Sequence, residues 1–180
     1  DKALKMNITG GKYNSLSIKT ADFANIKPTL SKIRQAVFNS LGSLGEFESF
    51  CDVFSGSGIM AFEAASRGFS VTAIELDKKS ARVIKENIKK IGADIDFINY
   101  DAIKFLAKTD KVFDVFYLDP PYMSDLYNKV LSVINNRNLL ATNGVIILEK
   151  PVSVEVDATG FELVKEKTYA DKVICYYKKS

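Results

Sequence analysis

The segment LDPPYM (residues 118–123) follows the apolar run VFDVFY and combines an acid, two prolines and an aromatic residue. Proline cannot donate to a sheet ladder, so we expect the strand to end here. The carboxylate of Asp119 and the carbonyl of Pro120 are two hydrogen-bond acceptors, and neither Pro120 nor Pro121 brings a competing N–H. Tyr122 offers a face on which a flat ring could stack.

Such a corner suits chemistry on an amine attached to an aromatic base. The lone pair of that nitrogen is delocalised into the ring, and two preorganised acceptors for its N–H bonds would localise it. Asp119 need not be a strong base, because the alkylated amine is an acidic cation whose proton a carboxylate of ordinary pKa, ~4, can accept. The alternative interpretation is purely structural: a proline turn that only ends a strand.

A glycine loop, DVFSGSGIMA (residues 52–61), lies earlier in the chain. Gly56 and Gly58 can adopt backbone angles closed to other residues and let a ligand approach the main chain. The helix start that follows would offer unpaired N–H groups. Because Gly56-x-Gly58-x-x-Ala61 also fits the looser dinucleotide fingerprint, NAD or FAD competes as the ligand, and a purely structural turn is a third interpretation.

Acids at the ends of the next expected strands indicate what the loop could bind. A carboxylate at Glu75 can accept both hydroxyls of a ribose, and one at Asp101 could accept from an adenine amino group. The loop has no basic residue for phosphates, which favours S-adenosylmethionine, whose ammonium group suits an acid such as Asp52. The same acids could instead cap helix N-termini.

Composition excludes several kinds of chemistry. The 180 residues, 47% hydrophobic and 26% charged, are typical of one globular domain. There is no histidine, which excludes Ser-His-Asp and Cys-His catalysis and histidine metal sites. Cys51 and Cys175 lie in separate apolar segments, so we expect no disulfide framework, no metal site and a reducing, cytoplasmic setting. No apolar run is long enough for a membrane helix, and we expect no membrane contact.

Apolar runs that alternate with amphipathic segments from residue 50 onward are typical of a parallel sheet covered on both faces. We therefore predict a doubly wound α/β domain, residues 46–180, that ends in an antiparallel hairpin. The expected strands are 50–55, 70–76, 94–101, 112–119 and 144–150, with a hairpin around 169–171 and helices at 59–68, 78–91, 102–108 and 125–140.

Residues 1–45 form a basic extension in front of this domain. The segment 6–20 predicts a hairpin around Gly10-Gly11 or Asn14-Ser15, followed by a helix that starts at Pro28-Thr29 and ends near Gly42. The net charge of the chain is +3, and this extension holds seven Lys or Arg against two Asp. A basic arm before a near-neutral body suits an anionic macromolecule, although a solvated surface would look the same.

These segments resemble a known group of enzymes. DVFSGSG, the acid in AIELD, YDA and DPPY resemble motifs I to IV of class I S-adenosylmethionine-dependent amino-methyltransferases. KPTLSKIRQAVFN, with GGKYNSLSI ahead of it, narrows the resemblance to the ribosomal RNA small subunit methyltransferase D family, the 16S rRNA guanine-N2 methyltransferases. The resemblance implies a seven-stranded, mostly parallel sheet of order 3-2-1-4-5-7-6. The implied substrate is a guanine of 16S rRNA in an assembling small ribosomal subunit. We expect the protein to be a monomer.

The resemblance also implies roles for individual residues. The donor would be held by Asp52, Phe54, Ser55, Gly56, Ser57 and Gly58 at its methionine part, by Glu75 and Leu76 at its ribose, and by Asp101 and Ala102 at its adenine. Asp119, Pro120, Pro121 and Tyr122 would hold the target amine. Thr29 and Arg34, in the family's P-T-x-x-x-x-R pattern, would border the pocket, and Lys12 and Lys27 would contact RNA. Asn14 and Leu16 stand where the family commonly has arginines, so lysines would supply the phosphate contacts.

Other classes stay open from the residues alone. The same motifs serve adenine-N6 or cytosine-N4 methylation of DNA or RNA, and related pockets with Asn in place of Asp119 methylate protein glutamine. A non-catalytic adenosine-ligand or RNA-binding module and an NAD-linked oxidoreductase are further alternatives.

Overall fold

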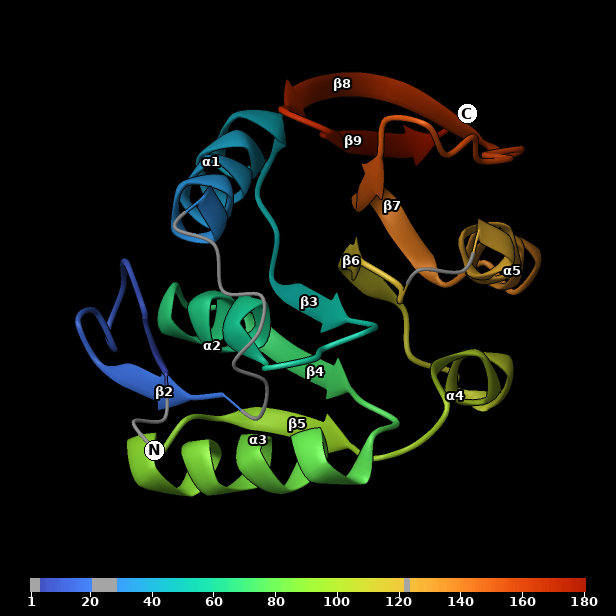
Figure 1. The fold of residues 1–180 in the computed structure, drawn as a ribbon. Helices are drawn as coiled ribbons and strands as arrows, with labels where there is room; N and C mark the ends of the chain where they lie inside the picture. Colours follow the sequence, from blue (N-terminus) through green and yellow to red (C-terminus); the bar gives the residue numbers. More distant parts are fainter. Residues whose placement is uncertain (1–3, 21–28, 122–123) are drawn as a thin grey trace.

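A seven-stranded sheet forms the centre of the molecule in the computed structural model (Figure 1). The structure describes residues 4–20, 29–121 and 124–180, apart from the side chains of 29, 30 and 124. In sheet order the strands are β5, β4, β3, β6, β7, β9 and β8; the first five run parallel, and β9 is antiparallel to both neighbours. Their bounds are β3 Ser49–Asp52, β4 Ser70–Ile74, β5 Ile95–Ile98, β6 Phe113–Leu118, β7 Leu140–Pro151, β8 Phe161–Tyr169 and β9 Lys172–Lys179.

Helices cover both faces of this sheet (Figure 1). Those on the first face are α1 (Thr29–Leu44), α2 (Ile59–Ser66) and α3 (Lys78–Ile91), and those on the second are α4 (Ala102–Lys108) and α5 (Ser124–Asn136). Each face has its own hydrophobic cluster, with Phe62 in the first and Leu131 in the second. The doubly wound α/β fold is therefore confirmed. Numbered from β3, the strand order is also the expected 3-2-1-4-5-7-6.

Local signals explain where the elements begin and end. The Asp77 side chain accepts a hydrogen bond from the Ser80 amide (2.8 Å) and starts α3, and Gly92, with φ 73°, ends it as predicted. The helix predicted at 125–140 ends earlier, because Asn138 has φ 57° and turns the chain into β7. β3 is shorter than the predicted 50–55, since the chain leaves the ladder after Asp52 to form the glycine loop.

The N-terminal hairpin packs on α2 and α3. It pairs β1 (Lys5–Asn7) with β2 (Ser17–Lys19), as the sequence predicts. Both the amide of Lys12 and that of Tyr13 donate to Ser66, to its carbonyl and its hydroxyl respectively, each at 2.8 Å. Asn87 of α3 bonds both main-chain groups of Lys19. These contacts fix the hairpin against the body, while the division into units 1–45 and 46–180 stays a prediction.

The two cysteines lie on different strands, Cys51 on β3 and Cys175 on β9, as free thiols. Both side chains are buried, and burial raises the pKa of each thiol. Neither is therefore a good nucleophile at neutral pH.

Two glycines should respond oppositely to substitution by alanine. At Gly11, φ is +76° and an added Cβ would lie 1.9 Å from the Ser66 carbonyl oxygen. Gly11→Ala should lower the free energy of unfolding by roughly 2 kcal/mol or more, from strain and clash. Gly42 lies inside α1 with nothing within 4 Å, so Gly42→Ala should raise it by about 0.5–1 kcal/mol. Urea unfolding measures both, and equal effects would contradict the hairpin docking described above.

Candidate active site

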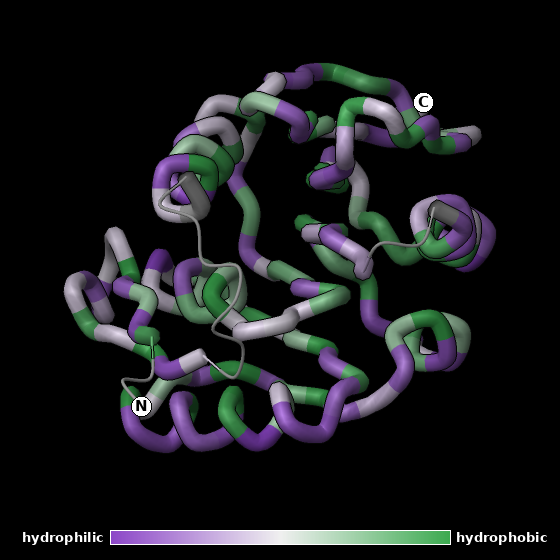
Figure 2. The backbone as a smooth tube through the Cα atoms, viewed as in Figure 1, coloured by the Kyte–Doolittle hydropathy of each residue, from purple (hydrophilic) through white to green (hydrophobic). Residues whose placement is uncertain are grey.

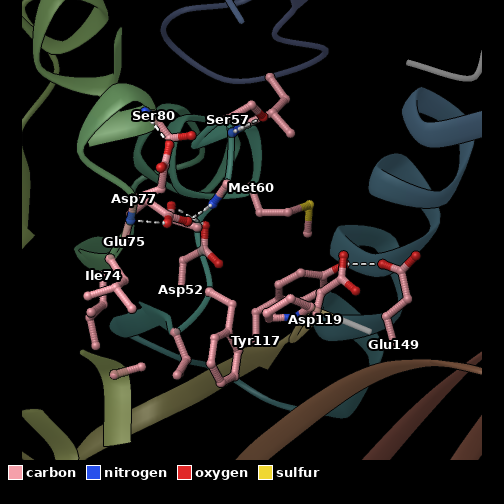
Figure 3. Close-up of a pocket in the computed structure, with 18 of the residues that line it drawn as sticks. Asp52, Ser57, Met60, Ile74, Glu75, Asp77, Ser80, Tyr117, Asp119 and Glu149 are labelled. Atoms are coloured by element: carbon pink, nitrogen blue, oxygen red, sulfur yellow. Dashed lines mark hydrogen bonds between the residues drawn. The ribbon is translucent and has the colours of Figure 1, made fainter. Parts of the chain in front are cut away.

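A cavity of about 1020 Å³ opens at the carboxyl ends of the parallel strands (Figure 3). Ligands of doubly wound sheets bind in this position, where the strand order reverses. The four acids that the sequence singled out at strand ends all line it: Asp52, Glu75, Asp101 and Asp119. Pockets for one drug-sized ligand measure roughly 300–1,000 Å³, so this cavity has room for a cofactor and part of a second ligand.

The glycine loop forms one wall of the cavity. Gly56 and Gly58 have φ of 57° and 84°, which only glycine adopts readily. Glu75 at the end of β4 holds the loop, because its carboxylate accepts from the amide of Gly56 (2.7 Å) and from that of Asp77 (2.8 Å). Apart from its chain neighbours, no atom of the described residues lies within 4 Å of the position of a Cβ at Gly56, which leaves the loop's main chain open to a ligand.

Asp52 is the buried acid at the base of this loop. Its side chain is 1% exposed, and Ser55 Oγ donates to Oδ2 at 2.8 Å. Its other oxygen, Oδ1, is buried and has no hydrogen-bond partner among the described residues. Burial is the main reason that the pKa of Asp52 is raised to about 7. A cation placed beside Oδ1 would satisfy this oxygen and stabilise the ionised form.

Asp101, which the sequence analysis assigned to the adenine, could serve two functions in the structure. The Asp101 carboxylate accepts from the Lys104 amide at 2.9 Å and so caps α4. It also lines the cavity, next to Ala102 and the exposed apolar surfaces of Leu76 and Tyr100. Both interpretations of this acid are therefore compatible with the structure, and the two exposed side chains could cover a flat ring.

The DPPY corner lies on the opposite side of the cavity. Asp119 and Pro121 line it, whereas Pro120 is buried beside it, and Tyr122 lies outside the described residues. Asp119 is exposed to the cavity, although the surrounding protein is dense enough to desolvate its carboxylate. Burial, followed by the negative charge of Glu149, raises the pKa of Asp119, while Lys172 lowers it. Burial and the second acid thus make Asp119 a stronger base than the carboxylate of ordinary pKa that the sequence analysis found sufficient.

Glu149 is a site residue that the sequence analysis missed. It is 3% exposed near the end of β7 and lies beside Asp119, because Leu118 and Leu148 are paired in the sheet (Figure 3). Its carboxylate accepts from the Tyr117 hydroxyl and from Lys172 Nζ (2.9 Å). A charge at the end of the apolar run GVIILE was the available signal. Met60, also missed, extends from α2 between the glycine loop and Asp119.

The predicted substrate-binding residues are dispersed. Arg34 lines the cavity but is 3% exposed, with Nε bonded to Glu63 (2.9 Å) and Nη2 to the Asn7 carbonyl (2.6 Å). Lys12 lies away from the cavity, with its Nζ 5.1 Å from the ring centroid of Tyr13. Thr29 begins α1, with its side chain not described, and Lys27 is outside the described residues.

Glu63 connects this wall of the cavity to the hairpin. Its buried carboxylate accepts from the amide and hydroxyl of Thr9, the amide of Gly10, Arg34 Nε and Arg67 Nε. Burial alone would raise the pKa of Glu63, but the bonds from Thr9, Arg34 and Arg67 outweigh it and lower the pKa. Arg34 is therefore held in place by internal partners as one side of the cavity.

The sheet order, the glycine loop after the first parallel strand and the acids at the following strand ends define the fold of the class I methyltransferases. The family model described as Conserved hypothetical protein 95 matches residues 6–178, and the chain belongs to this family.

Individual relatives agree with this assignment. The ribosomal RNA small subunit methyltransferase D of Buchnera aphidicola subsp. Baizongia pistaciae is 32% identical over 83% of this chain and 78% of its own. The protein of the same name from Buchnera aphidicola subsp. Acyrthosiphon pisum is 28% identical over 97% of this chain and 93% of its own. The structure of a putative methyltransferase, yhhF, from Escherichia coli superposes with a TM-score of 0.86 at 23% identity, covering 98% of both chains. The resemblance seen in the motifs is thereby confirmed.

Across 4–20, 29–121 and 124–180, no helix could cross a bilayer, and no three His, Cys, Asp or Glu side chains gather as metal ligands.

Glu63→Gln should destabilise the protein in a pH-dependent way. At pH 7 the loss should be roughly 3 kcal/mol, because a buried ion pair is broken. The pKa of Glu63 is lower in the folded than in the unfolded chain, so its contribution is present above ~4.3 and disappears as pH falls through the folded value. Urea unfolding at several pH values would show wild type and variant converging in acid. The exposed Glu155→Gln is the control, and a difference that persists at low pH would refute this role for Glu63.

Proposed function

We propose that the protein is an S-adenosylmethionine-dependent methyltransferase that acts on ribosomal RNA of the small subunit, at the exocyclic N2 of a guanine. The observation that carries the proposal is one cavity that has a glycine loop and the Asp52 carboxylate on one side and the Asp119 corner on the other. One oxygen of the Asp52 carboxylate has no partner among the described residues. The names of the relatives support rRNA as the substrate. The guanine N2 position rests on the DPPY corner with Asp at its first position.

The residues present fit the proposed donor. Asp52 Oδ1 would pair with the ammonium group, and residues 54–58 would surround the methionine part. Glu75 would accept from the ribose hydroxyls, and Asp101, with Ala102, from the adenine, between Leu76 and Tyr100. When bound, S-adenosylmethionine supplies an electrophilic methyl group.

At the other end of the cavity the protein would hold the amine and take up its proton. The Asp119 carboxylate and the Pro120 carbonyl would accept the two N–H bonds, which concentrates the lone pair on nitrogen, and Tyr122 would stack on the base. As the N–C bond forms, the bond between the methyl group and the donor sulfur would break and leave a neutral thioether. One N–H bond of the methylated amine would then break, and its proton would pass to Asp119. A raised pKa makes Asp119 a better acceptor for that proton than an ordinary carboxylate, provided that it is ionised when the base binds.

The remaining predicted residues would border the RNA. Thr29 and Arg34 would form the α1 side of the pocket, where the internal bonds of Arg34 support a positioning role. Lys12 and Lys27 would contact phosphates, without reading bases. The substrate would be the rRNA of an assembling small subunit, bound by a monomer.

The deciding experiment uses rRNA from a strain that lacks the gene. Incubation with the protein and donor should restore one N2-methylguanine, detected by mass spectrometry of the nucleosides. A duplex DNA oligomer that is the better acceptor would refute the rRNA assignment, and N6-methyladenine would refute the guanine assignment.

Asp119→Ala should reduce methylation at least about 100-fold, because a preorganised acceptor is lost, while donor affinity stays within a few-fold. In wild type the rate should rise with pH over a range above that of an ordinary carboxylate, since the ionised form of Asp119 is required and its pKa is raised. Single-turnover rates across pH measure this dependence. A variant with normal turnover would remove Asp119 from the mechanism.

Asp52→Asn should affect stability and donor binding in opposite directions. The pKa of Asp52 is raised in the folded protein, so ionisation of Asp52 lowers the stability of the ligand-free wild type as pH rises through about 7. The Asn variant, which stays neutral, should therefore be more stable than wild type at pH 8. Donor affinity, measured by calorimetry, should fall about tenfold or more because the partner of the ammonium group is lost. Unchanged donor affinity would contradict the proposed orientation of the donor.

A further inference from the structure

The outward side of α3 carries a straight row of four cations. Lys78, Arg82, Lys85 and Lys89 follow the spacing i, i+4, i+7, i+11, and all four are exposed. In an α-helix this spacing keeps the side chains within one narrow stripe, about 16 Å long. Figure 2 shows this side of the helix as hydrophilic along its whole length. We call these four residues the α3 basic row.

The α3 basic row lowers the stability of the protein when no partner is bound. Its members repel one another at spacings of three and four residues, and Lys78 lies in the first turn, against the helix dipole. The only acid in α3 is Glu86, and within the described parts of the chain no row member makes an ion pair. Other exposed lysines do have acidic partners: Lys111 pairs with Asp96 and Lys129 with Asp125.

The N-terminal hairpin continues the basic surface beyond the end of α3. Asn87 fixes Lys19 beside the helix, and Lys5 lies directly opposite Lys19 in the β1–β2 pair. Two like charges in cross-strand register are again unfavourable without a partner. The hydroxyl of Tyr13, whose ring lies next to Lys12, donates to the carbonyl of Gly92 just after α3 (3.4 Å).

The other end of the row reaches the candidate active site. Lys78 lines the cavity, together with Asp77 and Ser80 from the same helix start. The row therefore runs without interruption from the edge of the cavity to the hairpin. This cationic path begins on the Glu75 side of the cavity, across from the Asp119 corner.

We infer that the α3 basic row, continued by Lys19 and Lys5, binds successive phosphates of the RNA strand that delivers the target nucleotide to the cavity. Phosphate contacts fix the register and orientation of the RNA without reading its sequence. Such contacts complement the cavity, where the target base itself would be recognised. A single-stranded or looped segment is the suitable partner, because its target base can be splayed out while its backbone stays on the row. The choice of RNA as the partner rests on the proposed function, whereas the role of the α3 basic row in binding is a separate claim.

The test compares two variants that lose the same charge. The row variant is Arg82→Gln/Lys85→Gln/Lys89→Gln, which leaves the cavity residue Lys78 intact. The control is Lys104→Gln/Lys108→Gln/Lys167→Gln, whose positions are exposed, have no ion pair among the described residues and lie on α4 and β8. Binding of small-subunit rRNA is measured by filter retention between 50 and 200 mM salt, together with methylation kinetics, donor affinity and thermal unfolding.

The row variant should bind rRNA about tenfold or more weakly than wild type. The slope of log Kd against log salt should fall by about 2, as expected for three lost phosphate contacts to a single strand. Its donor affinity should stay at the wild-type value and its midpoint of unfolding should stay or rise, because repulsion is relieved. The control should match wild type in every readout.

Equal losses in row variant and control would overturn the inference and indicate a net-charge effect. Row-dependent binding that is tighter for duplex DNA than for rRNA would overturn it as well. If wild type methylates no rRNA, the proposed function fails, but the binding slopes still decide whether the row holds RNA. If wild type methylates rRNA and the row variant does so with unchanged KM and salt dependence, the function stands and the inference fails.

Discussion

The buried carboxylate of Glu63 accepts hydrogen bonds from the hairpin, from α1 and from its own helix, through Thr9, Gly10, Arg34 and Arg67. A charge without solvent is tolerated only because these donors satisfy it. The same bonds fix the N-terminal segments on the sheet, and those segments contribute one wall of the cavity and the hairpin end of the basic surface. The α1 wall of the cavity and the hairpin end of the basic surface thus keep their relative positions through one internal ion cluster.

The cavity itself concentrates negative charge. Asp52 ends β3, Asp119 directly follows β6 and Glu149 lies near the end of β7, so the parallel register of these neighbouring strands brings them together. Lys172 and the Tyr117 hydroxyl compensate Glu149, whereas Asp52 and Asp119 have raised pKa values because burial is not fully offset. Such a site favours a cationic ligand with hydrogen-bond donors over a phosphate. The electrostatics therefore agree with a sulfonium donor better than with a dinucleotide.

The sequence was most informative where backbone requirements are local. Turn residues and periodicity predicted nearly all elements, and the carboxyl-end rule placed Asp52, Glu75, Asp101 and Asp119 in one cavity. It could not predict the pKa of Asp119 or the contribution of Glu149, since both depend on the register between β6 and β7. The internal role of Arg34 was hidden for the same reason, because Glu63 lies 29 residues away and meets it only after folding. The features that the sequence predicted follow from local pattern, whereas the features that it missed depend on pairing between residues far apart in the chain.

The burial of both cysteines has a practical consequence. Cys51 and Cys175 are enclosed in the sheet and their thiols resist ionisation, so alkylating reagents should leave them unmodified in the folded protein. A single cysteine introduced on an exposed surface would then be the only site that reacts. The native chain can therefore carry one fluorescent or spin label at a chosen position, without prior removal of its own sulfur groups, to report how a bound polynucleotide is oriented.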